Sequence, residues 1–153
     1  MRVAVVAGPD PGHAFPAIEL CRRFRAAGDA PTLLTGTRWL DVARAEGVDA
    51  VELDGLDPTA FDDDTDAGEK IHRRAARMAV LNRVRIGELS PDLVVSDSIT
   101  VCGGLAADLL GVRWVELNTH PLYRPSKGPL RWGAAWHPAS DCAVGHATPS
   151  CAR

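Results

Sequence analysis

Short apolar runs alternate along the chain with longer segments in which apolar residues recur at helical spacing. The apolar runs are predicted strands, over residues 2–7, 31–35, 50–53, 92–96 and 113–117. The intervening segments are predicted helices, over residues 14–27, 37–45, 67–89 and 99–110. Because the strands are apolar on both faces and alternate with helices, the pattern predicts a Rossmann-like α/β fold with helices on both faces of a parallel sheet.

Glycine and proline residues stand where this pattern needs its breaks. Gly28 and Gly111 follow predicted helices at positions that suit a C-cap, and Pro91 begins a predicted strand. In a doubly wound sheet of strand order 3-2-1-4-5, the chain reverses direction between strands 1 and 4 and leaves a crevice at their carboxyl ends. We therefore expect a ligand site where the first and fourth strands end.

Composition narrows the class of partner. The 153 residues suffice for one domain or a fragment, and the net charge of −3 comes from interspersed charges. We expect no nucleic-acid or membrane partner, no transmembrane segment, and a cytoplasmic location. The cysteines are far apart and form no C-x-x-C pair, so we expect reduced, structural thiols rather than a zinc site or disulfides. They are Cys21, Cys102, Cys142 and Cys151.

Two charged segments have simple interpretations. The acidic stretch over residues 53–69 does not have the spacing of an EF-hand loop, and we interpret it as a solvated loop. The arginines that follow it are interpreted as the exposed face of a helix rather than as a phosphate site. They are Arg73, Arg74, Arg77, Arg83 and Arg85.

The loop after the first strand contains Gly8, Gly12 and His13. A dinucleotide fingerprint needs G-x-G-x-x-G, which is absent, and no acidic residue ends the second strand to hold a ribose. A Walker loop needs a lysine and a hydroxyl residue after its second glycine, where His13 and Ala14 stand. We therefore expect no bound cofactor, and a small reductase of flavodoxin-like architecture is disfavoured.

His13 and Asp97 follow the first and fourth strands, so the predicted strand order brings them to one crevice. A carboxylate beside a histidine fixes its tautomer and stabilises the imidazolium formed after proton abstraction, while a helix N-terminus favours the neutral ring beforehand. Asp97 or Ser98 alternatively caps a helix beginning at Ile99, and His13 is alternatively a loop histidine bonded to backbone. Gly12 is expected to allow a tight turn, and Pro16 to lie in the first turn of a helix.

These residues carry a resemblance to a known family. The run from Gly12 to Pro16 resembles the G-H-x-x-P opening of nucleotide-sugar-dependent glycosyltransferases of the GT-B fold, especially those that modify macrolides and other natural products. The segments over residues 91–97 and 105–115 are similar to the family's P-D-L-V-x-x-D and A-x-x-x-G-V-P-x-V motifs, although Arg113 stands where the family often has proline.

The resemblance implies that residues 1–128 form an incomplete N-terminal, acceptor-binding domain. His13 would be the catalytic base and Asp97 its partner, and the expected acceptor contacts are Gly12, Phe15, Ser98 and His120. An ordinary loop histidine is the alternative for His120. The nucleotide-sugar donor would bind only through a missing C-terminal domain. We therefore expect the 153 residues alone to be inactive, and the alternative function is a stand-alone small-molecule-binding or interaction module.

The final segment, residues 129–153, lacks the alternation of strands and helices. Members of the similar family continue here with a pattern like L-P-P-x-G-x-G-L-A-P-G. Because tryptophan has the single codon TGG, reading from the third base of each codon turns Trp132-Gly133 into glycine and Trp136-His137 into alanine, as that pattern requires. We predict an out-of-frame tail caused by a single-base deletion near the codon for Gly128, the alternative being a naturally short protein with a divergent end.

Overall fold

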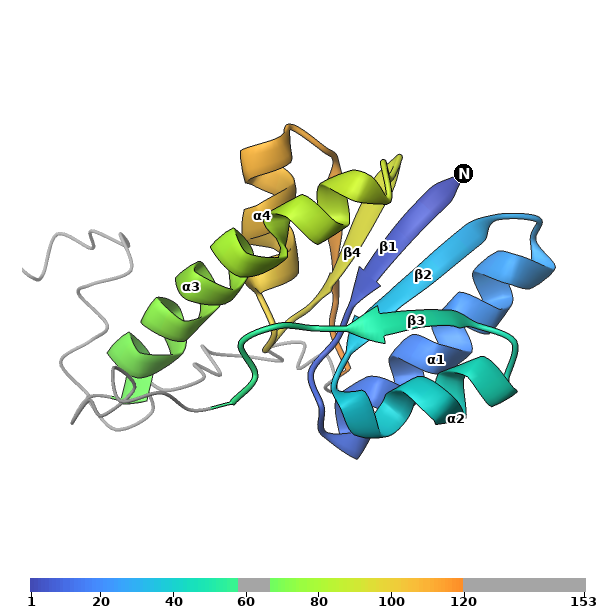
Figure 1. Cartoon of the computed structure of the whole chain (residues 1–153), viewed down its shortest axis with the longest axis horizontal. Helices are drawn as coiled ribbons and strands as arrows, with labels where there is room; N and C mark the ends of the chain where they lie inside the picture. The colour runs from blue at the N-terminus through green and yellow to red at the C-terminus, as the bar shows by residue number, and fades with distance from the viewer. Residues whose placement is uncertain (58–66, 120–153) are drawn as a thin grey trace, which may run out of the picture. The chain divides into compact units, whose positions relative to one another are not determined.

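Five parallel strands form the centre of the fold in a computed structural model that describes residues 1–57 and 67–119. These residues belong to one compact unit, Met1–Thr119, and residues 120–153 lie outside the described part of the chain. The strands are β1 (Arg2–Val6), β2 (Ala30–Thr35), β3 (Asp49–Glu52), β4 (Leu93–Asp97) and β5 (Trp114–Leu117). Their order, β3-β2-β1-β4-β5, confirms the predicted sheet and its reversal between β1 and β4 (Figure 1).

Helices cover both faces of the sheet. They are α1 (Pro11–Ala26), a short 3-10 turn η1 (Thr37–Trp39), α2 (Leu40–Ala45), α3 (Ala67–Glu88) and α4 (Cys102–Leu110). Figure 1 shows α3 and α4 together beside β4, with α1 and α2 near β2 and β3. This arrangement is the predicted Rossmann-like α/β architecture.

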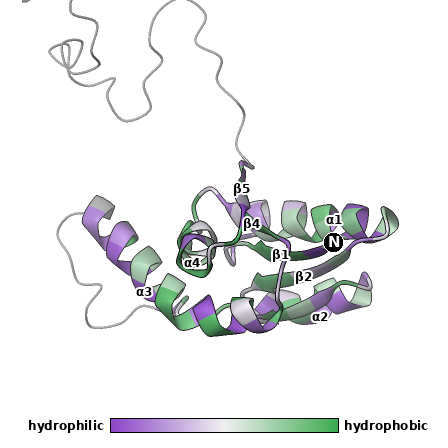
Figure 2. Ribbon diagram, turned by 90° about the horizontal axis from the view of Figure 1, so that it is seen from above, coloured by the Kyte–Doolittle hydropathy of each residue, from purple (hydrophilic) through white to green (hydrophobic). Residues whose placement is uncertain are grey.

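The two faces of the sheet carry two separate apolar clusters because successive side chains of a strand point in opposite directions. Val3 and Val5 of β1 pack with residues of α1 and α2, whereas Ala4 and Val6 pack with residues of α3 and α4. Figure 2 shows the hydrophobic residues along β1 and β4, and hydrophilic residues on the first half of α3. The sheet is therefore buried on both faces near β1.

Helix α1 begins at Pro11, three residues before the start at residue 14 that the sequence pattern predicted. Proline suits the first helical position, because its fixed φ is helical and its missing N–H would have had no intrahelical partner. The carbonyl of Asp10 accepts hydrogen bonds from the backbone N–H groups of His13 (3.0 Å) and Ala14 (2.9 Å). His13 consequently lies in the first turn of the helix rather than in a loop.

The early start of α1 corrects two expectations. Gly12 lies in the helix without a positive φ, and a β-carbon added to it would meet nothing within 4 Å outside its own helix turn, so the expectation of a tight turn there is wrong. Pro16 lies inside the helix rather than in its first turn. The glycines expected at the helix ends are confirmed: Gly28 follows Ala27, the C-cap residue of α1, Gly111 is the C-cap residue of α4, and their φ values of 86° and 68° lie in the left-handed region.

Helix α4 packs closely on the sheet at Gly103. A β-carbon at this position would lie 2.7 Å from Cβ of Val6 and 2.9 Å from Oγ of Ser96. Only a glycine fits so near two strands. The close approach holds the segment between β4 and α4 against the carboxyl end of β1.

The described cysteines and helices bear on the expectations about thiols and membranes. Cys21 and Cys102 are free and buried, and burial raises the pKa of each thiol to about 12. Cys142 and Cys151 lie outside the described residues. Within residues 1–57 and 67–119, no helix has the length and apolar character needed to cross a membrane.

Candidate active site

The carboxyl ends of β1 and β4 lie side by side, with Val6 paired to Ser96 in the parallel register. Beyond this pair, β1 continues through Gly8 into the first turn of α1, and β4 ends at Asp97. The strand reversal thus brings two segments that are far apart in sequence to one edge of the sheet, as the sequence analysis expected.

His13 and Asp97 are in direct contact at this edge. Nδ1 of His13 lies 2.7 Å from Oδ1 of Asp97, and the side chains are 11% and 0% exposed. Thr119 Oγ1 lies 3.3 Å from the same Nδ1. When Nδ1 carries the proton and donates it to the carboxylate, the neutral ring has its lone pair on Nε2, which is the arrangement a general base needs.

The second carboxylate oxygen of Asp97 is held by Thr100. Oδ2 accepts hydrogen bonds from Oγ1 of Thr100 at 3.1 Å and from its backbone N–H at 3.3 Å. Helix α4 begins later than predicted, with Val101 as its N-cap residue, so neither Asp97 nor Ser98 caps it. Asp97 instead orders the turn before the helix with one oxygen and contacts His13 with the other.

Thr100 is a residue of the site that the sequence analysis missed. The spacing Asp97-x-x-Thr100 is the signal that was available, because an aspartate commonly accepts hydrogen bonds from the backbone a few residues further along the chain. Gly8 leaves room for this hydroxyl, since a β-carbon on Gly8 would lie 2.7 Å from Oγ1 of Thr100.

A cavity of about 220 Å³ opens beside His13. Its walls come from the β1–α1 connection, from the segment after β3, from α3, and from the turn before α4. The lining residues outside the β1–α1 connection are Leu56, Ile71, Arg74, Ala75, Met78, Ile99, Thr100, Val101 and Cys102. The cavity is thus mostly apolar and has the histidine at one wall, as a small-molecule site would.

Three of the other expected acceptor contacts, Gly12, Phe15 and Ser98, do not line this cavity. Gly12 and Ser98 are absent from its lining, and the ring of Phe15 packs edge-on against Trp39 with ring centroids 4.9 Å apart. The hydroxyl of Ser98 is buried and has no hydrogen-bond partner in the described part of the chain. His120 lies outside the described residues. Contact between these four residues and an acceptor therefore stays a prediction.

Two side chains from the connection between β2 and α2 fix the β1–α1 connection. The indole Nε1 of Trp39 donates to the carbonyl of Pro9 at 2.6 Å, and the guanidinium of Arg38 donates to the same oxygen. Arg38 also lies over the Trp39 ring, 4.8 Å from its centroid. The turn that leads to His13 is thus tied to the neighbouring strand as well as to its own helix.

Comparison with known proteins shows which proteins the chain resembles. No protein-family model matches the chain. Over 142 residues it is 31% identical to L-demethylnoviosyl transferase of Streptomyces niveus, an alignment that covers 85% of this chain and 37% of the transferase. The glycosyltransferase SnogD of Streptomyces nogalater superposes with a TM-score of 0.64 and 27% identity, covering 78% of this chain and 33% of SnogD.

The chain is similar to GT-B glycosyltransferases over most of its own length. SsfS6, a glycosyltransferase of Streptomyces sp. SF2575 complexed with thymidine diphosphate, shares the fold with a TM-score of 0.62 at 23% identity. It is matched over 77% of this chain and 38% of its own length. The chain therefore spans well under half the length of the transferases that it matches. Its similarity to glycosyltransferases agrees with the resemblance inferred from its motifs.

Proposed function

We propose that the chain forms the acceptor-activating part of a glycosyltransferase that moves a sugar from a nucleoside-diphosphate sugar to a hydroxyl of a small-molecule acceptor. The observation that carries the proposal is the buried 2.7 Å contact between His13 and Asp97 at the wall of the cavity. The similarity to L-demethylnoviosyl transferase, 31% identical over an alignment that covers 85% of this chain, supports the proposal.

In the proposed reaction, Nε2 of His13 takes the proton of the acceptor hydroxyl, and Asp97 stabilises the resulting imidazolium. The acceptor oxygen forms a bond to the anomeric carbon of the sugar. The bond between that carbon and the phosphate oxygen breaks, and the nucleoside diphosphate leaves with the electron pair. Thr100 keeps the Asp97 carboxylate oriented by holding the oxygen that His13 does not contact.

The donor is proposed to bind to a second domain, with the first domain extending to residue 128. SsfS6 holds thymidine diphosphate, and the chain matches only 38% of that protein. We expect the purified 153-residue chain to transfer no sugar from a thymidine-diphosphate sugar to an acceptor, measured by mass spectrometry of the acceptor. Detection of a glycosylated product would contradict the requirement for a second domain.

The role of His13 is tested in a chimera in which residues 1–119 replace the matching segment of L-demethylnoviosyl transferase. His13→Ala is expected to lower kcat/KM by about 10²- to 10⁴-fold, the usual contribution of a general base. His72→Ala is the matched control, because His72 lies exposed on α3 and does not line the cavity. Unchanged turnover in the His13→Ala chimera would refute the proposed base, and acceptor binding without turnover in the parent chimera would favour a binding module.

A further inference from the structure

The polar side chains that line the cavity beside His13 are not equally engaged. Nδ1 of His13 and the hydroxyl of Thr100 both contact the Asp97 carboxylate, so these two atoms already have partners inside the protein. Among the described lining residues, Arg74 of α3 is the one that is a lysine or an arginine, and its side chain is half-buried. A guanidinium placed in a mostly apolar cavity needs hydrogen-bond acceptors, because an arginine stays charged at every physiological pH.

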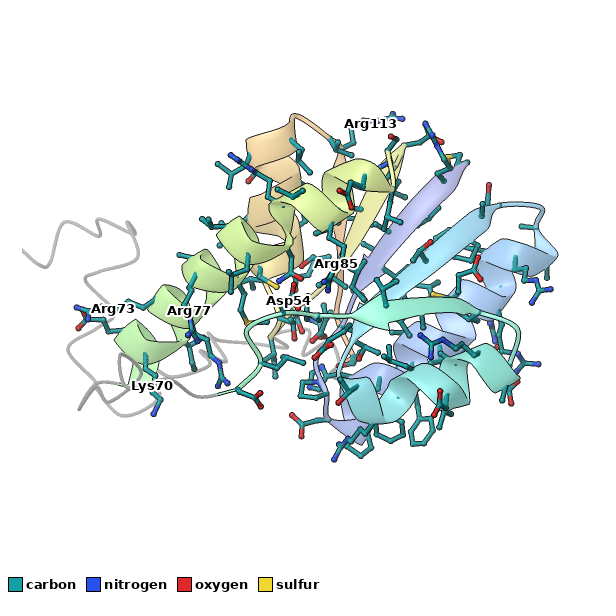
Figure 3. The ribbon with its side chains drawn as sticks, in the orientation of Figure 1. Asp54, Lys70, Arg73, Arg77, Arg85 and Arg113 are labelled. Atoms are coloured by element: carbon teal, nitrogen blue, oxygen red, sulfur yellow. The ribbon has the colours of Figure 1, made fainter. Side chains whose placement is uncertain are left out.

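Within the described residues, the guanidinium of Arg74 donates to the backbone carbonyl of Leu56 and forms no ion pair. Other α3 arginines differ in this respect. Arg73 pairs with Glu69, one turn away, and Arg85 lies 3.1 Å from Asp54. Figure 3 shows Arg85 directed toward Asp54, and Arg73 near the start of α3.

The geometry of an arginine suits an anionic ligand at this position. A guanidinium has five N–H donors in one plane, and a single carbonyl oxygen accepts only part of them. The donors that remain match the spacing of two oxygens on a carboxylate. A cation that contacts a neutral carbonyl inside the protein is therefore able to bind a carboxylate of a ligand without first breaking an ion pair.

A carboxylate also lines the cavity and opposes this attraction. Asp10, which precedes α1, belongs to the same lining as Arg74 but is exposed to solvent, and the two side chains do not pair. Solvent screens an exposed charge more than a half-buried one. The end of the cavity formed by α3 is therefore the end that favours an anion.

We infer that the cavity takes an apolar acceptor that carries an anionic oxygen group, with Arg74 binding the anion. This inference rests on the proposed function in that the ligand is taken to be the acceptor. The preference of the cavity for an anionic ligand is a separate property and is tested separately. In this inference the side chains of Ile71, Met78 and Ile99, which line the cavity, contact the apolar part of the acceptor, and the hydroxyl to be activated lies at the His13 wall.

The test uses the full 153-residue chain and two probes of similar shape, 2-naphthoate and its neutral analogue 2-naphthamide, in calorimetric titrations at low salt. The chain is expected to bind naphthoate at least tenfold more tightly than the amide. Arg74→Gln should remove this preference while leaving the affinity for the amide within about twofold. Arg73→Gln, which removes an exposed arginine already paired on the same helix, should retain it.

Equal binding of the two probes by the parent chain overturns the inference, as does failure to bind either one or a preference that persists in Arg74→Gln. Arg74→Lys keeps the charge but not the planar donors, and it should retain a reduced preference. If Arg74→Gln does not fold because the Leu56 contact is lost, the test relies on Arg74→Lys. An unchanged or absent preference of this variant for 2-naphthoate over 2-naphthamide contradicts a planar guanidinium site. Loss of activity in the His13 chimera is a separate result, since probe binding does not require proton transfer.

Discussion

The fit between Gly8 and Thr100 allows a strict test of how the Asp97 carboxylate is held. A β-carbon on Gly8 would lie 2.7 Å from Oγ1 of Thr100, 3.7 Å from Oδ2 of Asp97 and 3.9 Å from Cβ of His13. Only the first distance is too short for a contact. Gly8→Ala must therefore displace the Thr100 hydroxyl, which now donates to Asp97 at 3.1 Å.

The expected loss of stability follows from the negative charge of Asp97, which accepts this hydrogen bond. A hydrogen bond to a charged group contributes about 1.5–3 kcal/mol, so Gly8→Ala and Thr100→Ala should each lower the free energy of unfolding by roughly that amount. With the hydroxyl already removed, the added methyl group meets nothing closer than 3.7 Å. In the Thr100→Ala background, Gly8→Ala should be neutral or stabilising by about 0.4–1 kcal/mol, because alanine restricts the unfolded chain.

The assay is urea unfolding of the four proteins of this double-mutant cycle, followed by circular dichroism. The double variant should be about as stable as Thr100→Ala alone, which corresponds to a coupling of about 1.5–3 kcal/mol. Additive losses would refute the reasoning, since they would mean that the alanine at position 8 clashes with backbone or that the hydroxyl contributes nothing to holding Asp97.

Three further predictions address packing, thiols and the tail. Gly103→Ala should lower the free energy of unfolding by about 2 kcal/mol, because overpacking against β1 costs about 3 kcal/mol while the higher helix propensity of alanine returns about 1. Gly12→Ala should raise the free energy of unfolding by up to about 1 kcal/mol in the same urea assay, because an added β-carbon meets no neighbouring atom within 4 Å. Cys21 and Cys102, whose pKa values burial raises to about 12, should resist alkylation at pH 8 until the protein unfolds, as mapped by mass spectrometry, and rapid labelling of either in the native state would contradict their burial. Because unfolded thiols ionise near pH ~8.5, these two sites should also reduce stability as the pH rises from about 9 toward 12. DNA sequencing around the codon for Gly128 should reveal a downstream frame that continues the family pattern, and its absence would sink the frameshift hypothesis.

The strand order and the His13–Asp97 contact followed from the sequence because both depend on connectivity. Parallel strands joined through helices leave few arrangements, and two residues that follow adjacent strands meet at one edge. The start of α1 was missed because Pro11 and Gly12 were interpreted as breakers, although proline is compatible with a first helical turn.

The finer contacts of the site depend on side-chain packing, which periodicity does not encode. Phe15 follows the histidine closely, yet its ring packs against Trp39 and not toward the cavity. Thr100 holds Asp97, although a threonine before a helix has many other uses. In the sequence Arg74 looks like any exposed helix arginine, but in the fold it lines the cavity and contacts Leu56, whereas Arg73 is exposed and pairs with Glu69.

Two hydrogen bonds to the Pro9 carbonyl hold one wall of the cavity, the turn before His13, whereas the described residues of the α3 wall make no hydrogen bond to that turn. Arg38 and Trp39 attach the turn before His13 to the segment after β2, so a shift of that turn would disturb two connections at once. The α3 wall makes no hydrogen bond to this turn among the described residues. Substitutions on α3 can therefore change which molecule fits while His13 and Asp97 keep their contact, so ligand choice and proton transfer are free to evolve separately in this fold.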